Sequence, residues 1–237
     1  MKSQLVTLVE IWQSGSLCCG SLQADRALNI SAGQYVQLWQ DLQQTTLPLT
    51  VFPISLVEDG LFAVDHLIPL WVPGDQLHLF GPLGHGFELP AAARSIALVS
   101  LGESPVRLLP LLNQALKRDA AVTLFYPGIE IDPIFPRDLP PEVEIQPLSA
   151  LPGLVTWADY LAIDMDLSQL SQLSGLLGRA NLNRQLTAQG QVLIRSAMPC
   201  AGRAACGVCA ISTRRGLRLA CEDGPVFDLE DVLDVAG

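Results

Sequence analysis

Residues 198–227 read MPCAGRAACGVCAISTRRGLRLACEDGPVF and contain four of the six cysteines in this chain of 237 residues. The four follow the spacing C-x5-C-x2-C-x11-C, at Cys200, Cys206, Cys209 and Cys221. A segment of about 40 residues buries too little apolar surface to fold by itself, so a cross-link or a bound metal must hold it. We therefore predict that these four cysteines are the ligands of a metal centre.

Three kinds of cross-link are compatible with this spacing. Disulfides require an oxidising compartment. A structural zinc site usually pairs two C-x2-C knuckles, and only Cys206 and Cys209 form one here. The plant-type ferredoxin loop, C-x4-C-x2-C with a distant fourth cysteine, differs by one residue in its first gap. The small residues of AGRAACGVCA (201–210) let backbone N–H groups converge on cluster sulfurs, which favours an iron-sulfur cluster over zinc.

The chain before the cysteines divides into two zones. Residues 1–90 contain short alternating apolar segments separated by turn residues, a pattern typical of a small antiparallel β-barrel. Strands are predicted within these segments: 5–12, 35–40, 47–57, 60–67 and 75–84.

Residues 91–195 have a different period. An apolar run at 95–101, helical spacing at 104–119 and a second run at 120–128 predict a βαβ unit with a parallel sheet. Ser104 is the expected N-cap of the helix, and Pro110 should kink the helix or shift its start. A helix at 167–186 and a strand at 192–194 continue the pattern. The predicted fold is thus mixed β and α/β, with a barrel at 1–90, an α/β domain at 91–195 and a cluster domain at 196–237.

Charge and hydropathy exclude several functions. The net charge of -10 argues against a nucleic-acid partner. Arginines around the cysteines and the acidic residues that follow them indicate either a solvated surface of mixed charge or a docking face. The N-terminal residues alternate like a strand rather than a secretory signal, and the apolar stretches are shorter than the roughly 20 residues that a bilayer requires. We therefore predict a cytoplasmic protein without a membrane span.

Two stretches of the chain resemble a known family. Met198, Cys200, Gly202 and the other cysteines, together with DGPVF at 223–227, resemble the C-terminal [2Fe-2S] segment of the dihydroorotate dehydrogenase electron-transfer subunit family. GDQLHLFGPLGHGF at 74–87 is similar to that family's barrel-closing G-P-L-G-x-G-F motif. The resemblance implies a ferredoxin-reductase-like order of an FAD-binding-like barrel, an NAD-binding-like domain and a [2Fe-2S] domain, and a place in pyrimidine biosynthesis.

The resemblance also implies a partner. The chain would relay electrons to or from a flavoprotein catalytic subunit, within a hetero-oligomer. The alternative is a structural or assembly subunit, in which a cluster or a zinc ion serves mainly to fold the tail.

The family's nucleotide motifs are incomplete in this chain. Pro53, Ile54 and Ser55 match its flavin motif, but Phe52 replaces the arginine that would pair with a flavin phosphate. In the nucleotide loop, LVSLGESPV at 98–106, Gly102 and Pro105 remain and Glu103 lies where an anion would bind. The sequence therefore predicts weak or absent NAD binding, leaves FAD open, and makes NADH oxidation by this chain itself doubtful.

The remaining candidates carry weaker signals. We expect the adjacent Cys18 and Cys19 to lie in a turn without a redox function. His66, His78 and His85 lack ligand spacing and are expected to be ordinary histidines. Residues 225–227 form a short apolar wedge that either contacts a partner or is buried against the barrel.

Overall fold

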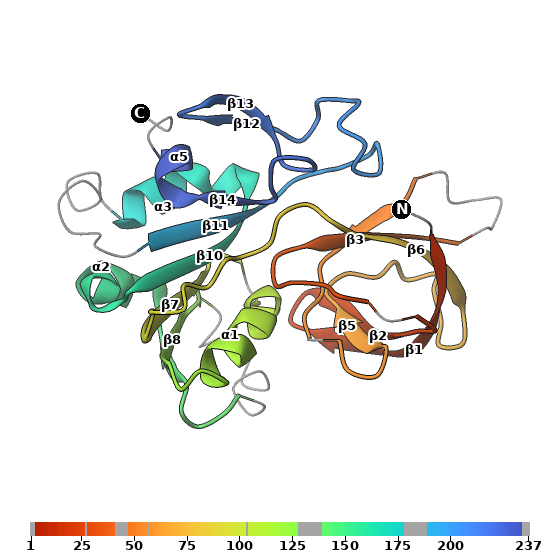
Figure 1. The fold of residues 1–237 in the computed structure, drawn as a ribbon, viewed down its shortest axis with the longest axis horizontal. Coiled ribbons are helices and arrows are strands. Elements are labelled where there is room, and N and C mark those ends of the chain that lie inside the picture. Colours follow the sequence, from red (N-terminus) through yellow and green to blue (C-terminus); the bar gives the residue numbers. More distant parts are fainter. Residues whose placement is uncertain are drawn as a thin grey trace.

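The computed structural model describes residues 3–26, 28–40, 47–55, 57–102, 104–127, 139–177 and 189–233. Within these ranges the strands form two six-stranded sheets and a two-stranded hairpin. The sheets lie side by side, with the hairpin above the second sheet (Figure 1). The antiparallel N-terminal sheet and the largely parallel second sheet confirm the mixed β and α/β class predicted from the sequence.

The N-terminal sheet has the order β4-β3-β6-β1-β2-β5, and each neighbouring pair is antiparallel. Alternate residues of its strands, such as Val6, Leu8 and Leu22, fill a buried core, as expected for a sheet with one apolar face. Its strands are β1 (Gln4–Ser14), β2 (Leu17–Ala24), β3 (Tyr35–Trp39), β4 (Leu49–Val51), β5 (Leu61–Val64) and β6 (Gln76–Leu83).

The two outer strands of this sheet are joined by the backbone that follows β4. Pro53 forms an isolated antiparallel bridge with Val64. The N–H of Ile54 donates to the carbonyl of Ala63 at 2.8 Å, and the N–H of Asp65 donates to the carbonyl of Phe52 at 3.0 Å. The segment with the incomplete flavin motif therefore runs along β5.

The second sheet has the order β14-β11-β10-β7-β8-β9. Strands β7 to β11 are parallel, and β14 is an antiparallel edge strand. β7 and β10 are buried along nearly their whole length and are mainly apolar, with Ser100 and Asp164 as buried polar exceptions, because the central strands of a parallel sheet are covered on both faces. The strands are β7 (Ser95–Ser100), β8 (Ala121–Phe125), β9 (Glu144–Gln146), β10 (Tyr160–Asp166), β11 (Gln189–Arg195) and β14 (Val226–Asp228).

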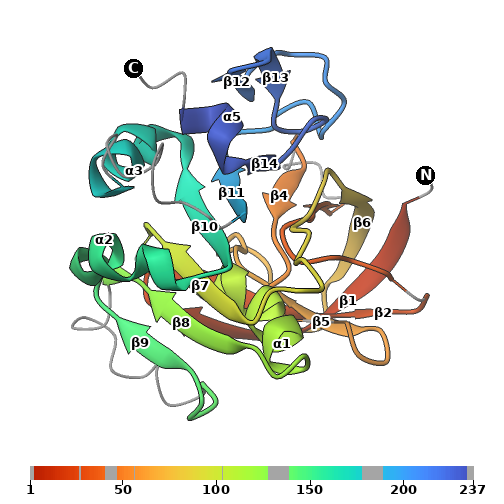
Figure 2. The ribbon, with the colours of Figure 1, turned by 60° about the vertical axis from the view of Figure 1, so that its left-hand side comes forward.

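Short helices connect and cover these strands (Figure 2). The segment after β7 packs against the N-terminal sheet, where Val106 shares a small buried cluster with Cys19 and Ile54. The helices are η1 (Val106–Leu108), α1 (Leu109–Leu116), η4 (Leu148–Ala150), α2 (Leu151–Leu154), η5 (Val155–Trp157), η6 (Leu167–Gln169), α3 (Leu170–Leu177) and α5 (Leu229–Leu233). In the part of the chain that is described, no helix is long and apolar enough to cross a bilayer.

Several details differ from the sequence predictions. Cys18 and Cys19 lie in β2 rather than in a turn, because residues 17–24 pair with both β1 and β5. Ser104 is not an N-cap: the 3-10 turn η1 begins after Pro105, and no side chain caps it. Pro110 shifts the start of the helix as predicted, since α1 begins at Leu109. The predicted helix at 167–186 is observed through Leu177, and the rest lies outside the described residues.

The tail returns to the second sheet after the cysteines. Residues 210–213 and 216–219 form the hairpin of β12 (Ala210–Thr213) and β13 (Gly216–Leu219). Val226 and Phe227 then pair with β11 as part of β14 and are buried. Of the two alternatives for residues 225–227, the structure therefore favours burial over a partner contact, with the apolar run completing the edge of the second sheet.

Candidate metal centre

The first three predicted ligands lie on an irregular loop between β11 and β12. Four of its residues have left-handed backbone: Ala201 (φ 55°), Gly202 (φ 71°), Ala204 (φ 54°) and Gly207 (φ 71°). This conformation is open to glycine, and bulky or branched side chains rarely adopt it. The local run of Ala and Gly therefore allows the backbone to curl around one point.

The curled backbone directs N–H groups at the sulfur of Cys200. The N–H groups of Ala205, Arg203 and Cys206 donate to this sulfur, as does the thiol of Cys206. These bonds, led by that from Ala205, outweigh the effect of burial and lower the pKa of Cys200 to about 6. The thiolate, which is the form that binds metals, is thus favoured here before any metal arrives.

The other two predicted ligands, Cys209 and Cys221, form a second and more deeply buried pair. Cys209 and Cys221 are buried, and their side chains are hydrogen-bonded to each other. Burial raises the pKa of Cys221 to about 12, with further contributions from Cys209 and Cys200, while the N–H of Ala204 donates to the sulfur and opposes the rise. The structure therefore brings the four cysteines together as two pairs, Cys200 with Cys206 and Cys209 with Cys221.

The two pairs differ in exposure. Cys206 and the neighbouring Val208 face solvent, and Val208 is 55% exposed. Cys209 and Cys221 face the protein interior. One edge of the site is therefore accessible to another molecule, and the opposite edge rests on the N-terminal sheet.

Tyr35 of β3 supports the buried edge. Its hydroxyl donates to the carbonyl of Cys221 at 3.0 Å, and its side chain is fully buried. Burial, together with the charges of Cys221, Cys209 and Cys200, raises the pKa of Tyr35 above its usual value. A Cβ on Gly202 would lie 2.4 Å from the same hydroxyl, so the loop and the tyrosine fit only with glycine there.

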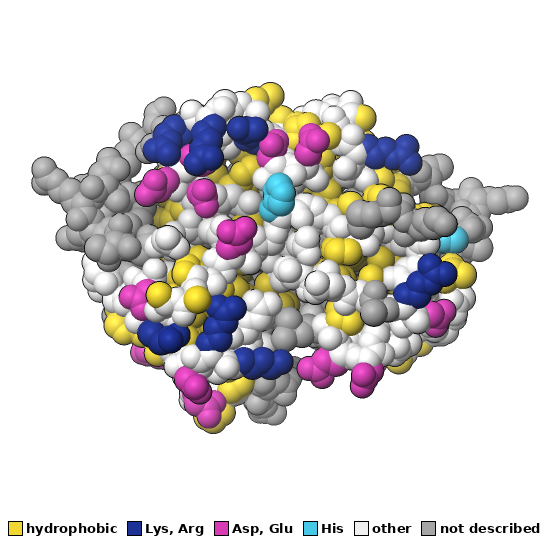
Figure 3. All heavy atoms as spheres, in the orientation of Figure 1, with side chains coloured by type: hydrophobic (Ala, Val, Ile, Leu, Met, Phe, Trp, Pro, Cys, Tyr) yellow, Lys and Arg dark blue, Asp and Glu magenta, His cyan; other side chains and the backbone are white. Residues whose placement is uncertain are grey.

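Ion pairs surround the hairpin next to the site. Arg214 and Arg215 contact Asp231 at 3.5 and 3.0 Å, and Arg218 contacts Asp223 at 3.1 Å. Basic and acidic side chains accordingly lie side by side on this part of the surface (Figure 3). These arginines form the mixed-charge surface that the sequence allowed, whereas Arg203 is exposed within the cysteine loop.

The histidines lie in separate places. His78 stacks on Trp39, a ring nitrogen of His85 lies 3.1 Å from the carbonyl of Asp223, and His66 is exposed. Among the residues that the structure describes, no three or more His, Cys, Asp or Glu side chains are arranged to hold a single metal ion.

The incomplete flavin motif also has a defined environment. Phe52 is 6% exposed, and the hydroxyl of Ser55 accepts the N–H of Ala63 at 2.8 Å. Gly102 lies near the start of the connection from β7 to η1, and a Cβ at this position would lie 3.4 Å from the Arg195 guanidinium. Glu103 lies outside the described residues.

Comparisons with known proteins agree with the resemblance stated from the sequence. Residues 196–233 match the family model of the iron-sulfur cluster binding domain of dihydroorotate dehydrogenase B. The chain is 23% identical over 226 residues to the electron transfer subunit of dihydroorotate dehydrogenase B (NAD(+)) from Clostridium perfringens, covering 88% of this chain and 89% of the relative. The predicted resemblance to this subunit family is confirmed.

Solved structures share the fold. An NADH-dependent reduced ferredoxin-NADP oxidoreductase studied for flavin-based electron bifurcation has a TM-score of 0.75 at 16% identity, covering 96% of this chain and 89% of its own. A ferredoxin NADP+ reductase from Neisseria gonorrhoeae with bound FAD and NADP has a TM-score of 0.62 at 12% identity, covering 82% and 99%. At these identities, the likeness establishes a ferredoxin-reductase-like fold.

Proposed function

We propose that this chain is an electron-transfer subunit that holds a [2Fe-2S] cluster on Cys200, Cys206, Cys209 and Cys221. It relays electrons to or from a flavoprotein catalytic partner that resembles dihydroorotate dehydrogenase, in a hetero-oligomer. The observation that carries this proposal is the arrangement of the four cysteines as two hydrogen-bonded pairs, with backbone N–H groups of residues 203–206 donating to the sulfurs of Cys200 and Cys221.

The pairing supports a binuclear cluster over a zinc ion. In a [2Fe-2S] cluster with four thiolates, each iron takes two of them and the bridging sulfides separate the pairs. A structural zinc ion instead needs all four ligands around one point. Cys200 with Cys206 and Cys209 with Cys221 match the first arrangement, and the two pairs come from different depths of the fold.

The cluster would supply one-electron chemistry, and the chain's own groups would tune it. Backbone N–H groups of residues 203–206 donate to the sulfurs of Cys200 and Cys221 and would stabilise the negative charge that these sulfurs carry in a bound cluster. The exposed edge at Cys206 and Val208 gives a partner close access to the site. The partner assignment follows the Clostridium perfringens relative, which is named as the electron transfer subunit of a dehydrogenase.

The proposal extends to the domain architecture of the chain and to its cellular location. The bridge between Pro53 and Val64 supports closure of the N-terminal sheet into a barrel. We retain the domain ranges 1–90, 91–195 and 196–237, noting that β14 of the last range pairs with β11 of the second. A cytoplasmic location agrees with the cysteines, all six of which are free thiols in the structure.

Anaerobic purification tests the proposal. We expect a coloured protein with equal iron and acid-labile sulfide, and an electron paramagnetic resonance signal that appears on reduction. Cys206→Ser should lower the iron content and bleach the colour, while the control Cys18→Ser, which alters a thiol of β2, should not. A colourless protein with one zinc ion would instead establish the structural or assembly function, and unchanged iron in Cys206→Ser would refute the ligand assignment.

A further inference from the structure

The second sheet defines where a dinucleotide would bind in this kind of fold. In an open α/β sheet, ligands bind beyond the carboxyl ends of the strands, at the point where the strand order reverses. Here the chain runs from β7 to β8 and β9 on one side, then returns to β10 and β11 on the other. The reversal lies between β7 and β10, so the crevice is bordered by Ser100, Asp164 and the start of η1.

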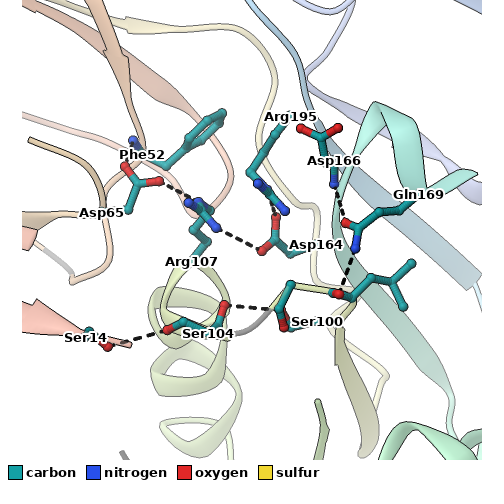
Figure 4. A network of polar contacts seen from close by, with 12 residues as sticks. Ser14, Phe52, Asp65, Ser100, Ser104, Arg107, Asp164, Asp166, Gln169 and Arg195 are labelled. Atoms are coloured by element: carbon teal, nitrogen blue, oxygen red, sulfur yellow. Dashed lines mark hydrogen bonds and ion pairs between the residues drawn. The ribbon is translucent and has the colours of Figure 1, made fainter. Parts of the chain in front are cut away.

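Four charged side chains of the protein itself occupy this crevice (Figure 4). Nε of Arg107, on η1, donates to Oδ2 of Asp65, which follows β5 of the N-terminal sheet. Nη1 of Arg107 lies 3.5 Å from Oδ2 of Asp164 on β10. Nε of Arg195, at the end of β11, donates to Oδ1 of Asp164 at 2.9 Å. We call Asp65, Arg107, Asp164 and Arg195 the interdomain latch.

Three of the four latch side chains are buried, whereas that of Arg195 is 21% exposed. The side chains of Arg107, Asp65 and Asp164 are 7%, 3% and 0% exposed. Burial alone would lower the pKa of Arg107, but Asp65 and Asp164 outweigh it and raise the pKa above its usual value. The guanidinium is therefore charged and already committed to two carboxylates.

Phe52 packs beside the interdomain latch. Its N–H donates to Oδ1 of Asp65 at 2.7 Å, and its ring centroid lies 6.2 Å from that of Tyr35. Both rings belong to the same buried core as the strands of the second sheet. The two sheets are thus packed directly against each other at the residue that replaces the flavin-motif arginine.

These contacts conflict with the needs of a dinucleotide. A diphosphate binds where unpaired N–H groups or guanidinium groups face it. In this crevice the charges of two guanidinium groups and two carboxylates balance, so two phosphates would meet no net positive charge there. A separate cavity of about 650 Å³ lies between β5 and α1, but its lining contains one carboxylate, Glu58, and one ammonium group, Lys117, and so offers no net positive charge.

We propose that the interdomain latch holds the two sheets together in place of a bound dinucleotide, and that this subunit binds neither FAD nor NAD(H). The inference concerns the crevice and does not depend on the ligands of the cluster. Combined with the proposed function, it makes the chain a one-electron carrier that receives electrons from a protein donor rather than from NADH.

Dinucleotide binding to the purified chain is the direct test. Denaturation of the native protein should release no flavin, and excess FAD, NADH or NADPH should leave the thermal unfolding midpoint unchanged, because a ligand stabilises only a state that it binds. Stoichiometric flavin, or a saturable rise of the midpoint with FAD or NADH, would overturn the proposal. Iron content is measured on the same samples, so a failure of the cluster assignment is distinguishable from a failure here.

Paired variants test the latch itself. Asp65→Asn and Arg107→Gln each leave a buried charge without its main partner, whereas the double variant removes both charges. We expect the double variant to lose less stability than the sum of the two single losses. Strictly additive losses would show that the two residues do not act as a pair and would overturn the latch. If the variants do not fold, the dinucleotide titrations of the native chain still decide the inference.

Discussion

The cysteine loop and the interdomain crevice are two potential cofactor sites with opposite character. In the loop, N–H groups of Ala205 and Arg203 point at a sulfur that is partly open to solvent. In the crevice, each charged group faces an opposite charge from the same chain, as Arg107 does between Asp65 and Asp164. From this comparison we infer that N–H groups directed at a cysteine sulfur indicate a metal site, whereas mutual pairing of charged side chains indicates a structural contact.

Removal of the metal should have the largest effect, and that effect should be confined to the cysteine loop rather than reach the interdomain crevice. We expect chelation of the reduced protein to loosen residues 198–222, because this segment lacks a core of its own, and to leave the two large sheets folded. Hydrogen exchange followed by mass spectrometry measures this directly. Equal loss of protection in β7 and β10 would show that the centre stabilises the whole molecule rather than its tail.

The latch should give the next largest effect. Asp164→Asn removes a carboxylate that is buried and paired with Arg107 and Arg195, and should lower the free energy of unfolding by about 3–5 kcal/mol. Asp223→Asn, which breaks the more exposed pair with Arg218, is the control and should cost about 1 kcal/mol or less. Chemical denaturation of both variants measures the difference, and equal losses would contradict the structural role assigned to the crevice.

These two regions also differ in how far the sequence could predict them. The four cysteines proposed as ligands and the Ala and Gly residues around them lie within one short segment, so their spacing alone indicates a metal centre. The four residues of the interdomain latch lie on four separate segments of the chain. Each is an ordinary charged residue, and only the tertiary structure shows which residue it pairs with. The sequence showed that Phe52 lacks a guanidinium, but it could not show that Asp65 and Arg107 fill the space.

Other predictions from the local sequence pattern failed for the same reason, because they depended on strand pairing between distant segments. β2 was missed because two adjacent cysteines and Gly20 break the alternating pattern, while its pairing with β1 and β5 is a tertiary property. The sequence leaves residues 225–227 open between a partner contact and burial, because it cannot show that β14 pairs with β11. The order of the sheets and the parallel βαβ unit were predictable, since they follow from periodicity and turn residues.

Two glycines of the cysteine loop provide a matched pair of variants. Gly202 and Gly207 have the same φ of 71°, but a Cβ at 202 would meet the hydroxyl of Tyr35 at 2.4 Å, whereas none of the atoms compared lies within 4 Å at 207. Gly207→Ala should cost about 1–2 kcal/mol from backbone strain alone. Gly202→Ala should cost about 1–3 kcal/mol more because of the overpacking.

Thermal unfolding and iron content of the two glycine variants check this expectation. Reduced iron occupancy in Gly202→Ala, with normal occupancy in Gly207→Ala, would show that the loop needs close contact with the N-terminal sheet. Equal behaviour of the two variants would mean that the loop holds its shape without Tyr35.

The smallest expected effect is that of Tyr35→Phe, which removes one hydroxyl and keeps the ring. The carbonyl of Cys221 loses its 3.0 Å hydrogen bond, so stability should fall by about 1 kcal/mol. Loss of the donor also leaves the partial negative charge of this carbonyl unopposed beside the proposed cluster, which should disfavour the more negative, reduced state and make the midpoint potential more negative. Tyr160→Phe is the control, because its hydroxyl donates to Gln191 at 2.6 Å, and the charges that act on it are Glu88 and Asp228 rather than cysteine sulfurs. A redox titration followed by electron paramagnetic resonance separates the two roles: a shift in Tyr35→Phe alone identifies Tyr35 as a positioning residue of the centre, and identical potentials in both variants would reduce it to packing.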